Sequence, residues 1–591
     1  MMFFILCKII NVEFLIDKYI IFNKIFENTD NNYLMERRKD MSKFKINYED
    51  KEYLVEENIT YKDLLEKYLK INPYDIALCK LNREYYELFK NITEDGKLEV
   101  IPFDSSIGYK IYGRTLQFIF IKATLDLFND SVITIEHSVG DGVFGELHKE
   151  EVLKEEDIVK IKERMIELIN KDIPIKKIKM KRREAIEIFK RYGMDDKVSL
   201  LNHVSFEYVS LYELDGRYDY FYGQMAASTG VIKGFDLMYY SPGFVLRYPK
   251  RDNLNVVAEF KENRKLSQIF LETERWLSIL GVGEVGSLND KVENHELRDL
   301  IMVSEALHEK KIAQIADMIN ERKETKMVLI AGPSSSGKTT FANRLSVQLR
   351  VNGYVPVPIS LDDYFVDREH TPKDENGEYD FESIYSLDLE LFNSNLGSLL
   401  KGEEVEIPRF NFKKGEREWI GNKLKLPNNG IILIEGIHGL NPILTSSISD
   451  KQKFKIYISA LTQLNLDNHN RIATTDIRRV RRIVRDYLSR GYGAEETLRM
   501  WPSIRRGEEK NIFVYQEEAD VMFNSTLVYE LCVLKKYALE ELDKIDPDSP
   551  VYILATRLKS FLGFFKEIDK DYVPTNSILR EFIGGSDFYK Y

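Results

Sequence analysis

The chain has 591 residues, of which 43% are hydrophobic, and a formal net charge of −11 at pH 7. This length is enough for about three or four domains, and the acidic balance argues against a protein whose whole surface coats nucleic acid, although local basic patches stay open. Three cysteines far apart in the sequence exclude a disulfide framework, and no apolar run approaches the roughly 18 residues of a membrane helix, so we expect a cytoplasmic protein without a membrane span.

Residues 1–41 precede the first clear strand pattern. Their apolar start is interrupted by charged residues from Lys8 onward, and no small-residue cleavage site follows. We therefore expect no signal peptide here. The segment is interpreted as an uncertain extension, which is either loosely attached or not translated in the native protein.

Residues 42–104 have the pattern of a small mixed sheet. A hairpin is expected over 44–55, a helix capped by Thr60 follows, and later strands are expected near 76–78 and 98–101. This outline predicts a β-grasp fold. It resembles the TGS domain that precedes the core of threonyl-tRNA synthetase.

Residues 105–285 extend that resemblance to the editing-type second domain of the same family, through Asp141-Gly142-Val143-Phe144 and the segment 173–189. That domain carries a histidine pair and a later Cys/His cluster. Tyr112-Gly113-Arg114-Thr115-Leu116 and Phe221-Tyr222-Gly223-Gln224-Met225 stand in those places without Cys or His. We therefore expect an editing-like α+β domain that lacks metal ligands and metal-dependent editing. Binding of RNA, binding of a partner, or no remaining role all stay open.

Residues 286–325 are predicted to be an exposed connecting helix, because apolar residues recur at helical spacing among many charges. Strand and helix signals then alternate over 326–545, which predicts a parallel sheet. Residues 546–591 are expected to form a C-terminal helical tail after the turn-forming segment Asp546-Pro547-Asp548-Ser549-Pro550.

The start of this second half carries a phosphate-binding pattern. Gly332 to Thr339 fit G-x-x-x-x-G-K-[ST], between an apolar run at 327–331 and a helical pattern at 340–349. Such a loop points backbone N–H groups at phosphates, while Lys338 reaches the β- and γ-phosphates and Thr339 binds Mg²⁺. The predicted phosphate-binding residues are Gly332, Ser334, Ser335, Ser336, Gly337, Lys338, Thr339 and Thr340.

Acidic residues follow two later strands of the same half. Asp362 and Asp363 come after the strand predicted over 355–360, and Glu435 ends the strand predicted over 431–434. Carboxylates at the C-terminal ends of parallel strands face the crevice where phosphates bind. One of the aspartates can therefore accept a proton from an attacking hydroxyl, and Glu435 can support Mg²⁺ directly or through water.

An arginine-rich helix follows at 478–490. Helical spacing places Arg478, Arg482 and Arg485 on one face, which requires an anion opposite. A solvated basic face or an RNA-binding patch are alternatives. An arginine lid over transferring phosphates fits better, since phosphoryl transfer needs cations to stabilise developing charge.

Together these motifs resemble the uridine kinase and phosphoribulokinase family over residues 326–530. Ser360-Leu361-Asp362-Asp363-Tyr364-Phe365, Asp380-Phe381-Glu382, Pro408-Arg409-Phe410-Asn411-Phe412 and Arg485-Asp486-Tyr487-Leu488-Ser489-Arg490-Gly491 match its base, ribose, pyrimidine and lid segments. The resemblance implies catalysis by Asp362, Lys338 and Arg485; a lid of Arg482, Arg485 and Arg490; metal binding by Thr339 and Glu435; and acceptor binding by Tyr364, Glu382, Arg409, Phe410, Phe412 and Arg417.

Three positions depart from the family pattern. Gly415 stands where uridine kinases carry a base-reading His, Phe410 replaces Tyr, and Tyr492 follows the lid glycine where Arg is usual. Without polar contacts to the base, discrimination against other acceptors is weakened. The reaction class is retained, while the acceptor is not fixed.

The sequence thus predicts a multidomain α+β and α/β protein, with a β-grasp and an editing-like domain followed by a P-loop NTPase-type kinase domain. The combination resembles bacterial nucleoside kinases of this family. It implies an ATP- and Mg²⁺-dependent kinase whose preferred acceptor is the 5′-hydroxyl of a nucleoside. Two alternatives stay open, namely another alcohol such as a sugar phosphate, and a nucleotide-gated RNA- or ribosome-associated regulator. Contact of the N-terminal half with RNA and homo-oligomerisation are also left open.

Overall fold

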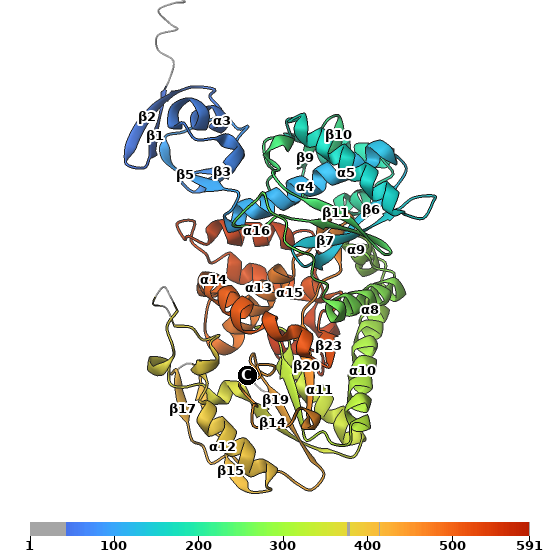
Figure 1. Cartoon of the computed structure of the whole chain (residues 1–591), viewed down its shortest axis with the longest axis vertical. Coiled ribbons are helices and arrows are strands. Elements are labelled where there is room, and N and C mark those ends of the chain that lie inside the picture. The colour runs from blue at the N-terminus through green and yellow to red at the C-terminus, as the bar shows by residue number, and fades with distance from the viewer. Residues whose placement is uncertain (1–42, 375–376, 378, 413, 590–591) are drawn as a thin grey trace, which may run out of the picture. The chain divides into compact units, whose positions relative to one another are not determined.

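The computed structural model describes residues 43–374, 377, 379–412 and 414–589 (Figure 1). The predicted extension at 1–41 lies outside this range. The described residues divide into two compact units, one made of 43–115 with 224–231 and the other of the described residues between 116 and 223 and from 232 to 589. This division is coarser than the six segments expected from the sequence, and the finer boundaries stay a prediction.

The first unit contains a five-stranded mixed sheet in the order β2-β1-β5-β3-β4. β1 pairs antiparallel with β2 and parallel with β5, as a β-grasp requires. A capping box at Thr60 starts a short helix that continues into one π-helical turn and covers the sheet. The elements are β1 (Lys43–Tyr48), β2 (Lys51–Glu56), α3 (Tyr61–Asp63), the turn Leu64–Leu69, β3 (Ile76–Leu81), β4 (Glu84–Tyr86) and β5 (Gly96–Pro102). The β-grasp prediction is confirmed.

Helix α4 (Ser106–Leu127) begins in the first unit and continues into the second. In the second unit its Phe120 ring packs against Phe244 of β12, with the ring centroids 4.3 Å apart. Two antiparallel sheets follow, in the orders β11-β12-β7-β6 and β10-β9-β8. Their elements are β6 (Val132–Val139), β7 (Gly142–His148), α5 (Glu155–Asn170), β8 (Lys176–Lys181), α6 (Arg182–Arg191), α7 (Asp195–Asn202), β9 (Tyr208–Leu214), β10 (Arg217–Asp219), β11 (Asp236–Tyr240) and β12 (Gly243–Arg247). This mixture confirms the expected α+β class.

Three helices, α8 (Arg264–Leu280), α9 (Val285–Glu293) and α10 (Leu297–Glu321), lead to the second half. The predicted connecting helix exists as α10, but the expectation that it is exposed is wrong for one of its sides. Ile312, Ile315 and Ile319 are fully buried in a core shared with α11, which runs beside α10 (Figure 1). The spacing of apolar residues predicted that a helix forms here, but it did not reveal that one side of the helix packs against α11.

The second half is built on a parallel sheet in the order β14-β19-β13-β20-β23. Its strands are β13 (Met327–Ala331), β14 (Val355–Ser360), β19 (Gly430–Glu435), β20 (Lys453–Ser459) and β23 (Val521–Asn524). Every residue of β13 is buried, as expected for a central strand between helical layers. Ser360 and Glu435 are register partners at the C-terminal ends of β14 and β19. The predicted parallel-sheet class is confirmed.

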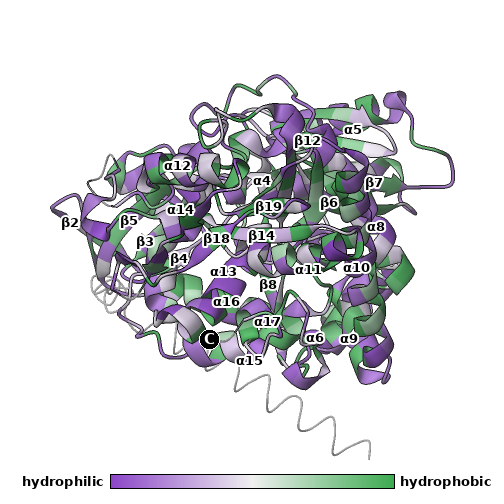
Figure 2. Cartoon of the chain, turned by 90° about the horizontal axis from the view of Figure 1, so that it is seen from below, coloured by the Kyte–Doolittle hydropathy of each residue, from purple (hydrophilic) through white to green (hydrophobic). Residues whose placement is uncertain are grey.

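Helices and small hairpins surround this sheet. The helices are α11 (Lys338–Val351), α12 (Leu389–Leu400), α13 (Thr474–Arg485), α14 (Ala494–Asn511), α15 (Glu530–Leu542), α16 (Tyr552–Leu562) and α17 (Arg580–Ile583). The hairpin strands are β15 (Glu404–Glu406) with β18 (Lys423–Lys425), β16 (Arg409–Asn411) with β17 (Glu416–Glu418), and β21 (Asn465–Asp467) with β22 (Asn470–Arg471). Hydrophilic (purple) and hydrophobic (green) segments both occur on the helices (Figure 2). None of the described helices is both long and apolar enough to cross a membrane.

Candidate active site

The phosphate-binding pattern forms the turn between β13 and α11, as the sequence predicts. Ser335 and Gly337 adopt positive φ angles of 60° and 84°, which curls the backbone into a concave loop. Gly332 allows the loop to lie close to β20, because a Cβ at this position would be 2.0 Å from the carbonyl oxygen of Ile458. The loop therefore packs closely against β20, and the N-terminus of α11, which follows the loop, faces the site.

Lys338 lies among carboxylates at this loop. Burial lowers the pKa of its ammonium group, while Glu435, Asp362 and Glu581 oppose that shift. The ammonium also donates to the carbonyl oxygen of Pro333 at 3.2 Å. Its charge is therefore held inside the site rather than in solvent.

Thr339 and Glu435 are brought together as predicted. The Thr339 hydroxyl donates to Glu435 Oε1 at 3.3 Å, and the Ser360 hydroxyl donates to the same oxygen at 3.0 Å. Burial and the neighbouring Asp362 charge raise the pKa of Glu435, while Lys338 and the Ser360 hydroxyl oppose that shift. A hydroxyl and a carboxylate are hard oxygen donors that suit Mg²⁺, which takes its other ligands from water and substrate phosphates.

The two neighbouring aspartates have different environments. Asp363 Oδ1 accepts the backbone N–H of Phe410 at 3.2 Å, and burial raises the pKa of Asp363 to about 6. Asp362 lies beside the Lys338 and Glu435 charges, and its Oδ2 is 4.0 Å from Nη2 of Arg490. This arrangement supports Asp362 as the proton acceptor and gives Asp363 a structural contact.

The arginine-rich helix α13 packs directly on the phosphate-binding loop. Arg478 Nε donates to the Ser334 carbonyl at 3.0 Å, and Arg482 Nη1 donates to the Ser334 hydroxyl at 2.7 Å. Arg478 also pairs with Glu508 of α14, and Arg481 pairs with Glu530 at 2.6 Å. The solvated basic face considered from the sequence is therefore wrong, because these guanidinium groups are buried.

The three residues predicted to form a lid converge on one carboxylate. Asp486 lies 2.7 Å from Arg485, 3.0 Å from Arg482 and 3.8 Å from Arg490. Burial would raise the pKa of Asp486, and these arginines lower it. Sequence reasoning gave Asp486 no role. The sequence did offer one signal, because Asp486 is an acidic residue within a run of arginines. A carboxylate in such a position can offset the repulsion between neighbouring guanidinium groups.

Two of the predicted acceptor residues form an aromatic group. The rings of Phe410 and Phe412 have centroids 5.2 Å apart, and Phe365 lies 5.7 Å from Phe410. The Arg490 guanidinium lies 4.5 Å from the Phe412 ring centroid, so the aromatic group adjoins the predicted lid. Arg490 also approaches Asp362, so the aromatic group and Asp362 both lie near the same guanidinium.

The other predicted acceptor residues are placed differently. Tyr364 is fully buried, with its ring edge-on to Phe392 and its hydroxyl accepting from Asn395 at 3.1 Å, so it belongs to the core. Arg409 is exposed on β16, and Arg417 Nη1 pairs with Asp388 at 2.8 Å.

Glu382 lies beside α14 and Arg482 rather than in the aromatic group. A Cβ at Gly507 of α14 would be 2.3 Å from Glu382 Cβ. Burial raises the pKa of Glu382 to about 7 against the attraction of Arg482. It therefore lies near Arg482, one of the residues predicted to form the lid.

Aromatic residues fill the editing-like positions where the family carries metal ligands. Tyr112 is buried in the first unit against Phe103, with centroids 5.9 Å apart. Phe221 packs on Phe118 in the second unit, with centroids 4.9 Å apart. Among the described residues, no group of three or more His, Cys, Asp and Glu side chains could hold a metal ion.

The C-terminal segment reaches the phosphate-binding loop. Glu581 Oε2 accepts the backbone N–H of Thr340 at 3.2 Å and its hydroxyl at 3.0 Å, and that hydroxyl also contacts the Tyr589 hydroxyl at 2.7 Å. No local sequence signal assigns these roles, because the contact joins residues 241 positions apart.

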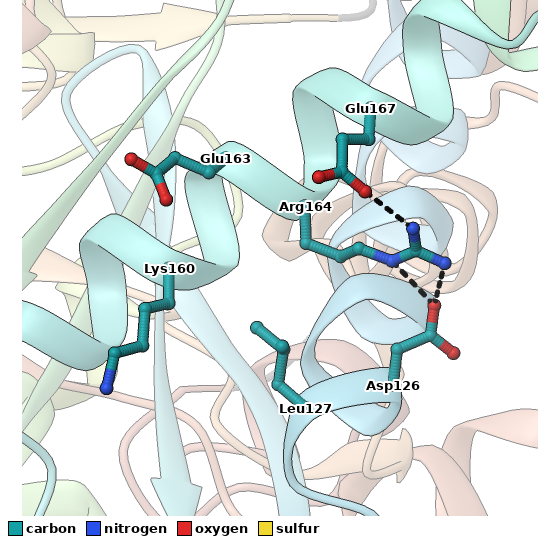
Figure 3. Close-up of a pocket in the computed structure, with 6 residues that line it drawn as sticks. All are labelled: Asp126, Leu127, Lys160, Glu163, Arg164 and Glu167. Atoms are coloured by element: carbon teal, nitrogen blue, oxygen red, sulfur yellow. Dashed lines mark hydrogen bonds and ion pairs between the residues drawn. The ribbon is translucent and has the colours of Figure 1, made fainter.

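A separate surface pocket lies between the end of α4 and α5 (Figure 3). It is lined by Asp126, Leu127, Lys160, Glu163, Arg164 and Glu167. Arg164 donates at 2.7 Å to both Asp126 and Glu167, so its charge is neutralised by two carboxylates. None of the site residues predicted from the sequence lies there.

Comparison with known proteins identifies two similarities. The N-terminal region is similar to threonine–tRNA ligases; the ligase of Syntrophotalea carbinolica is 33% identical over 161 residues, which are 27% of this chain and 25% of the ligase. A uridine kinase of Staphylococcus aureus is 29% identical over 184 residues, which are 31% of this chain and 79% of the kinase. The matched region therefore spans between 25% and 42% of the length of these ligases.

The phosphoribulokinase/uridine kinase family model matches residues 327–530. This range begins at the first residue of β13 and includes the phosphate-binding loop, both acidic strand ends and the arginine-rich helix. Residues 327–530 thus form a domain of the phosphoribulokinase and uridine kinase family.

Proposed function

We propose that the chain is an ATP-dependent kinase that transfers the γ-phosphoryl group to a hydroxyl of a small molecule, with the 5′-hydroxyl of a nucleoside as the preferred acceptor. One observation carries the proposal. Lys338, Thr339, Glu435 and Asp362 gather around one phosphate-binding loop at the C-terminal edge of a parallel sheet. Together these residues supply the phosphate-binding cation, the metal ligands and the proton acceptor that phosphoryl transfer uses.

In this reaction the acceptor oxygen bonds to the γ-phosphorus while the bond from that phosphorus to the β,γ-bridging oxygen breaks. The acceptor proton passes to a carboxylate oxygen of Asp362, and ADP leaves. Lys338 stabilises charge on the phosphates, and Thr339 with Glu435 would hold Mg²⁺. Bound Mg²⁺ supplies further neutralisation of phosphate charge.

The acceptor class is supported by the aromatic group at Phe365, Phe410 and Phe412. Aromatic faces stack on any nucleobase and discriminate weakly between bases. Arg490 links this group to Asp362, because it approaches both. A ring-bearing acceptor stacked there would lie next to the proposed base.

A nucleotide-gated, RNA-associated regulator is the second candidate. Its support is the similarity of the N-terminal region to threonine–tRNA ligases together with a buried link between the two halves of the second unit. Lys197 of α7 lies 2.7 Å from Asp467 of β21 and 3.2 Å from Asp219 of β10, all three being almost fully buried. Asp219 also contacts His469 at 2.7 Å. This link would transmit a change in the ligase-like half to the segment preceding α13.

ADP release from the full-length protein, with and without acceptor, tests the two candidates. The kinase proposal predicts ADP release that depends on an added nucleoside and is lost in Lys338→Ala, with a phosphorylated product of matching amount. If ADP release does not change with added nucleosides or sugar phosphates but increases with structured RNA, the kinase proposal is refuted in favour of the regulator.

A further inference from the structure

The C-terminal segment is a folded strap rather than a loose tail. Ile578, Leu579 and Phe582 are fully buried, and Phe582 lies beneath the Arg481 guanidinium at 5.0 Å. Arg580 donates to the Val573 carbonyl at 2.6 Å, which fixes the turn before α17. We define the strap as residues 577–589.

The strap presents an anion to the phosphate-binding loop. Thr340 lies in the first turn of α11, where N–H groups point out of the helix toward an anion. Its N–H and hydroxyl are both donated to Glu581. The same carboxylate acts electrostatically on Lys338 and Glu435, so it lies inside the charge cluster of the site.

The strap also contacts the loop and the lid sterically. A Cβ on Gly337 would be 2.7 Å from Ile578 Cγ2, so the loop glycine gives room to the strap itself. A Cβ on Gly584 would be 3.2 Å from Leu488 Cδ2 in the lid segment. The strap therefore touches both parts that must respond to a nucleotide.

These contacts conflict with nucleotide binding. Thr340 is one of the residues predicted to donate to the phosphates of ATP. A triphosphate entering the loop would find the N–H and hydroxyl of Thr340 already bonded to the Glu581 carboxylate. The phosphate and this carboxylate would also repel each other, because like charges interact strongly at short range in a buried site.

We propose that the strap is autoinhibitory: Glu581 takes the place of a phosphate oxygen on Thr340, and nucleotide binds only when the strap withdraws. The inference rests on the proposed function, because it concerns the same loop. By linkage, whatever holds the strap on the loop weakens ATP binding, and ATP releases the strap by the same factor.

Glu581→Gln tests the strap in the full-length protein. Glutamine keeps the size and an acceptor oxygen but removes the charge, so we expect the Kd for a non-hydrolysable ATP analogue to fall roughly tenfold, within the usual range of coupling between sites. Glu567→Gln is the matched control, since it removes an exposed charge from the same C-terminal region. Its Kd should equal that of the wild type.

Hydrogen exchange of the wild-type protein provides the second measurement, which does not depend on a variant. Saturating ATP analogue should speed amide exchange in residues 577–589 while slowing it in the phosphate-binding loop. Unchanged or slower exchange in the strap, or an unchanged or raised Kd in folded Glu581→Gln, would overturn the inference. ATP binding by the wild type in those cases leaves the proposed function intact, whereas a failure of all these proteins to bind ATP refutes both.

Discussion

Replacing Asp362 and Asp363 one at a time by asparagine separates catalysis from structure at adjacent positions. Asparagine keeps the shape of either side chain but cannot accept the acceptor proton. Asp362 lies next to Lys338, Glu435 and Arg490, so Asp362→Asn should reduce kcat by about 10²–10⁴-fold, the usual contribution of a general base. That loss equals about 2.7–5.5 kcal/mol in the activation barrier.

Asp363→Asn should have a much smaller effect. Its carboxylate accepts the Phe410 N–H, and the amide oxygen of asparagine can accept the same bond. We expect at most about 1 kcal/mol of change, appearing mainly in KM through the position of Phe410.

The assay is steady-state ADP release with a saturating nucleoside, together with ATP-analogue binding to show that each variant retains the nucleotide site. Asp362→Asn should bind ATP normally. If Asp363→Asn proves the more damaging change in kcat, the proton acceptor is Asp363 and the geometric assignment is refuted.

Three further variants test other parts of the molecule. Lys338→Ala should reduce turnover by about 10²-fold or more while the protein stays folded, and near-native turnover would contradict the role of the loop. Lys197→Ala should lower the free energy of unfolding by about 3–5 kcal/mol, because two buried carboxylates lose their cation, whereas Lys190→Ala at an exposed pair should change it by less than about 0.5 kcal/mol in the same denaturation experiment. Burial disfavours the ionised carboxylate and raises the pKa of Glu382 from its ordinary 4.5 to about 7, so the fold is most stable below pH 4.5, where Glu382 is protonated, and loses stability as pH rises to 7 and the buried carboxyl ionises. Glu382→Gln should therefore gain stability over the wild type between pH 5 and pH 8, by up to about 3 kcal/mol, and an equal difference at both pH values would contradict this.

The features that could be predicted from the sequence are those fixed by neighbouring residues. The phosphate-binding loop needs a strand, two glycines and a helix in immediate succession, and β13 and α11 supply them. The positions of Glu435 and Asp362 followed from the rule that parallel strands open their C-terminal ends toward one crevice. The β-grasp fold, though not the order of its strands, followed from strand and turn patterns within a short segment.

The features that could not be predicted depend on contacts between distant segments. Glu581 and Glu530 reach the loop and the arginine helix from residues far along the chain, and an exposed glutamate would have the same sequence pattern. Tyr364 was assigned to the acceptor by its motif, but Phe392 and Asn395 surround it. Tertiary packing determines which side chains contact one another, and the periodicity of apolar residues in the sequence does not reveal these contacts.

Gly415 shows how backbone conformation changes a prediction made from residue identity. The sequence suggests that Gly415→His with Phe410→Tyr would restore base-reading contacts and raise uridine preference by about 1–3 kcal/mol. In the structure Gly415 has φ of 76° in the β16–β17 turn, and its carbonyl accepts the Arg368 N–H at 2.9 Å. A Cβ there would be 2.9 Å from Arg368 Nε.

Histidine at 415 is therefore strained as well as crowded, with a backbone strain of about 1–2 kcal/mol. We now expect Gly415→His to lower stability and to leave uridine preference unchanged, while Phe410→Tyr alone is tolerated because Phe410 is only partly buried. Thermal unfolding and kcat/KM for uridine, cytidine and adenosine measure both effects. If Gly415→His keeps its stability and gains uridine preference, the turn is more adaptable than its left-handed geometry implies, and base selection depends on this position after all.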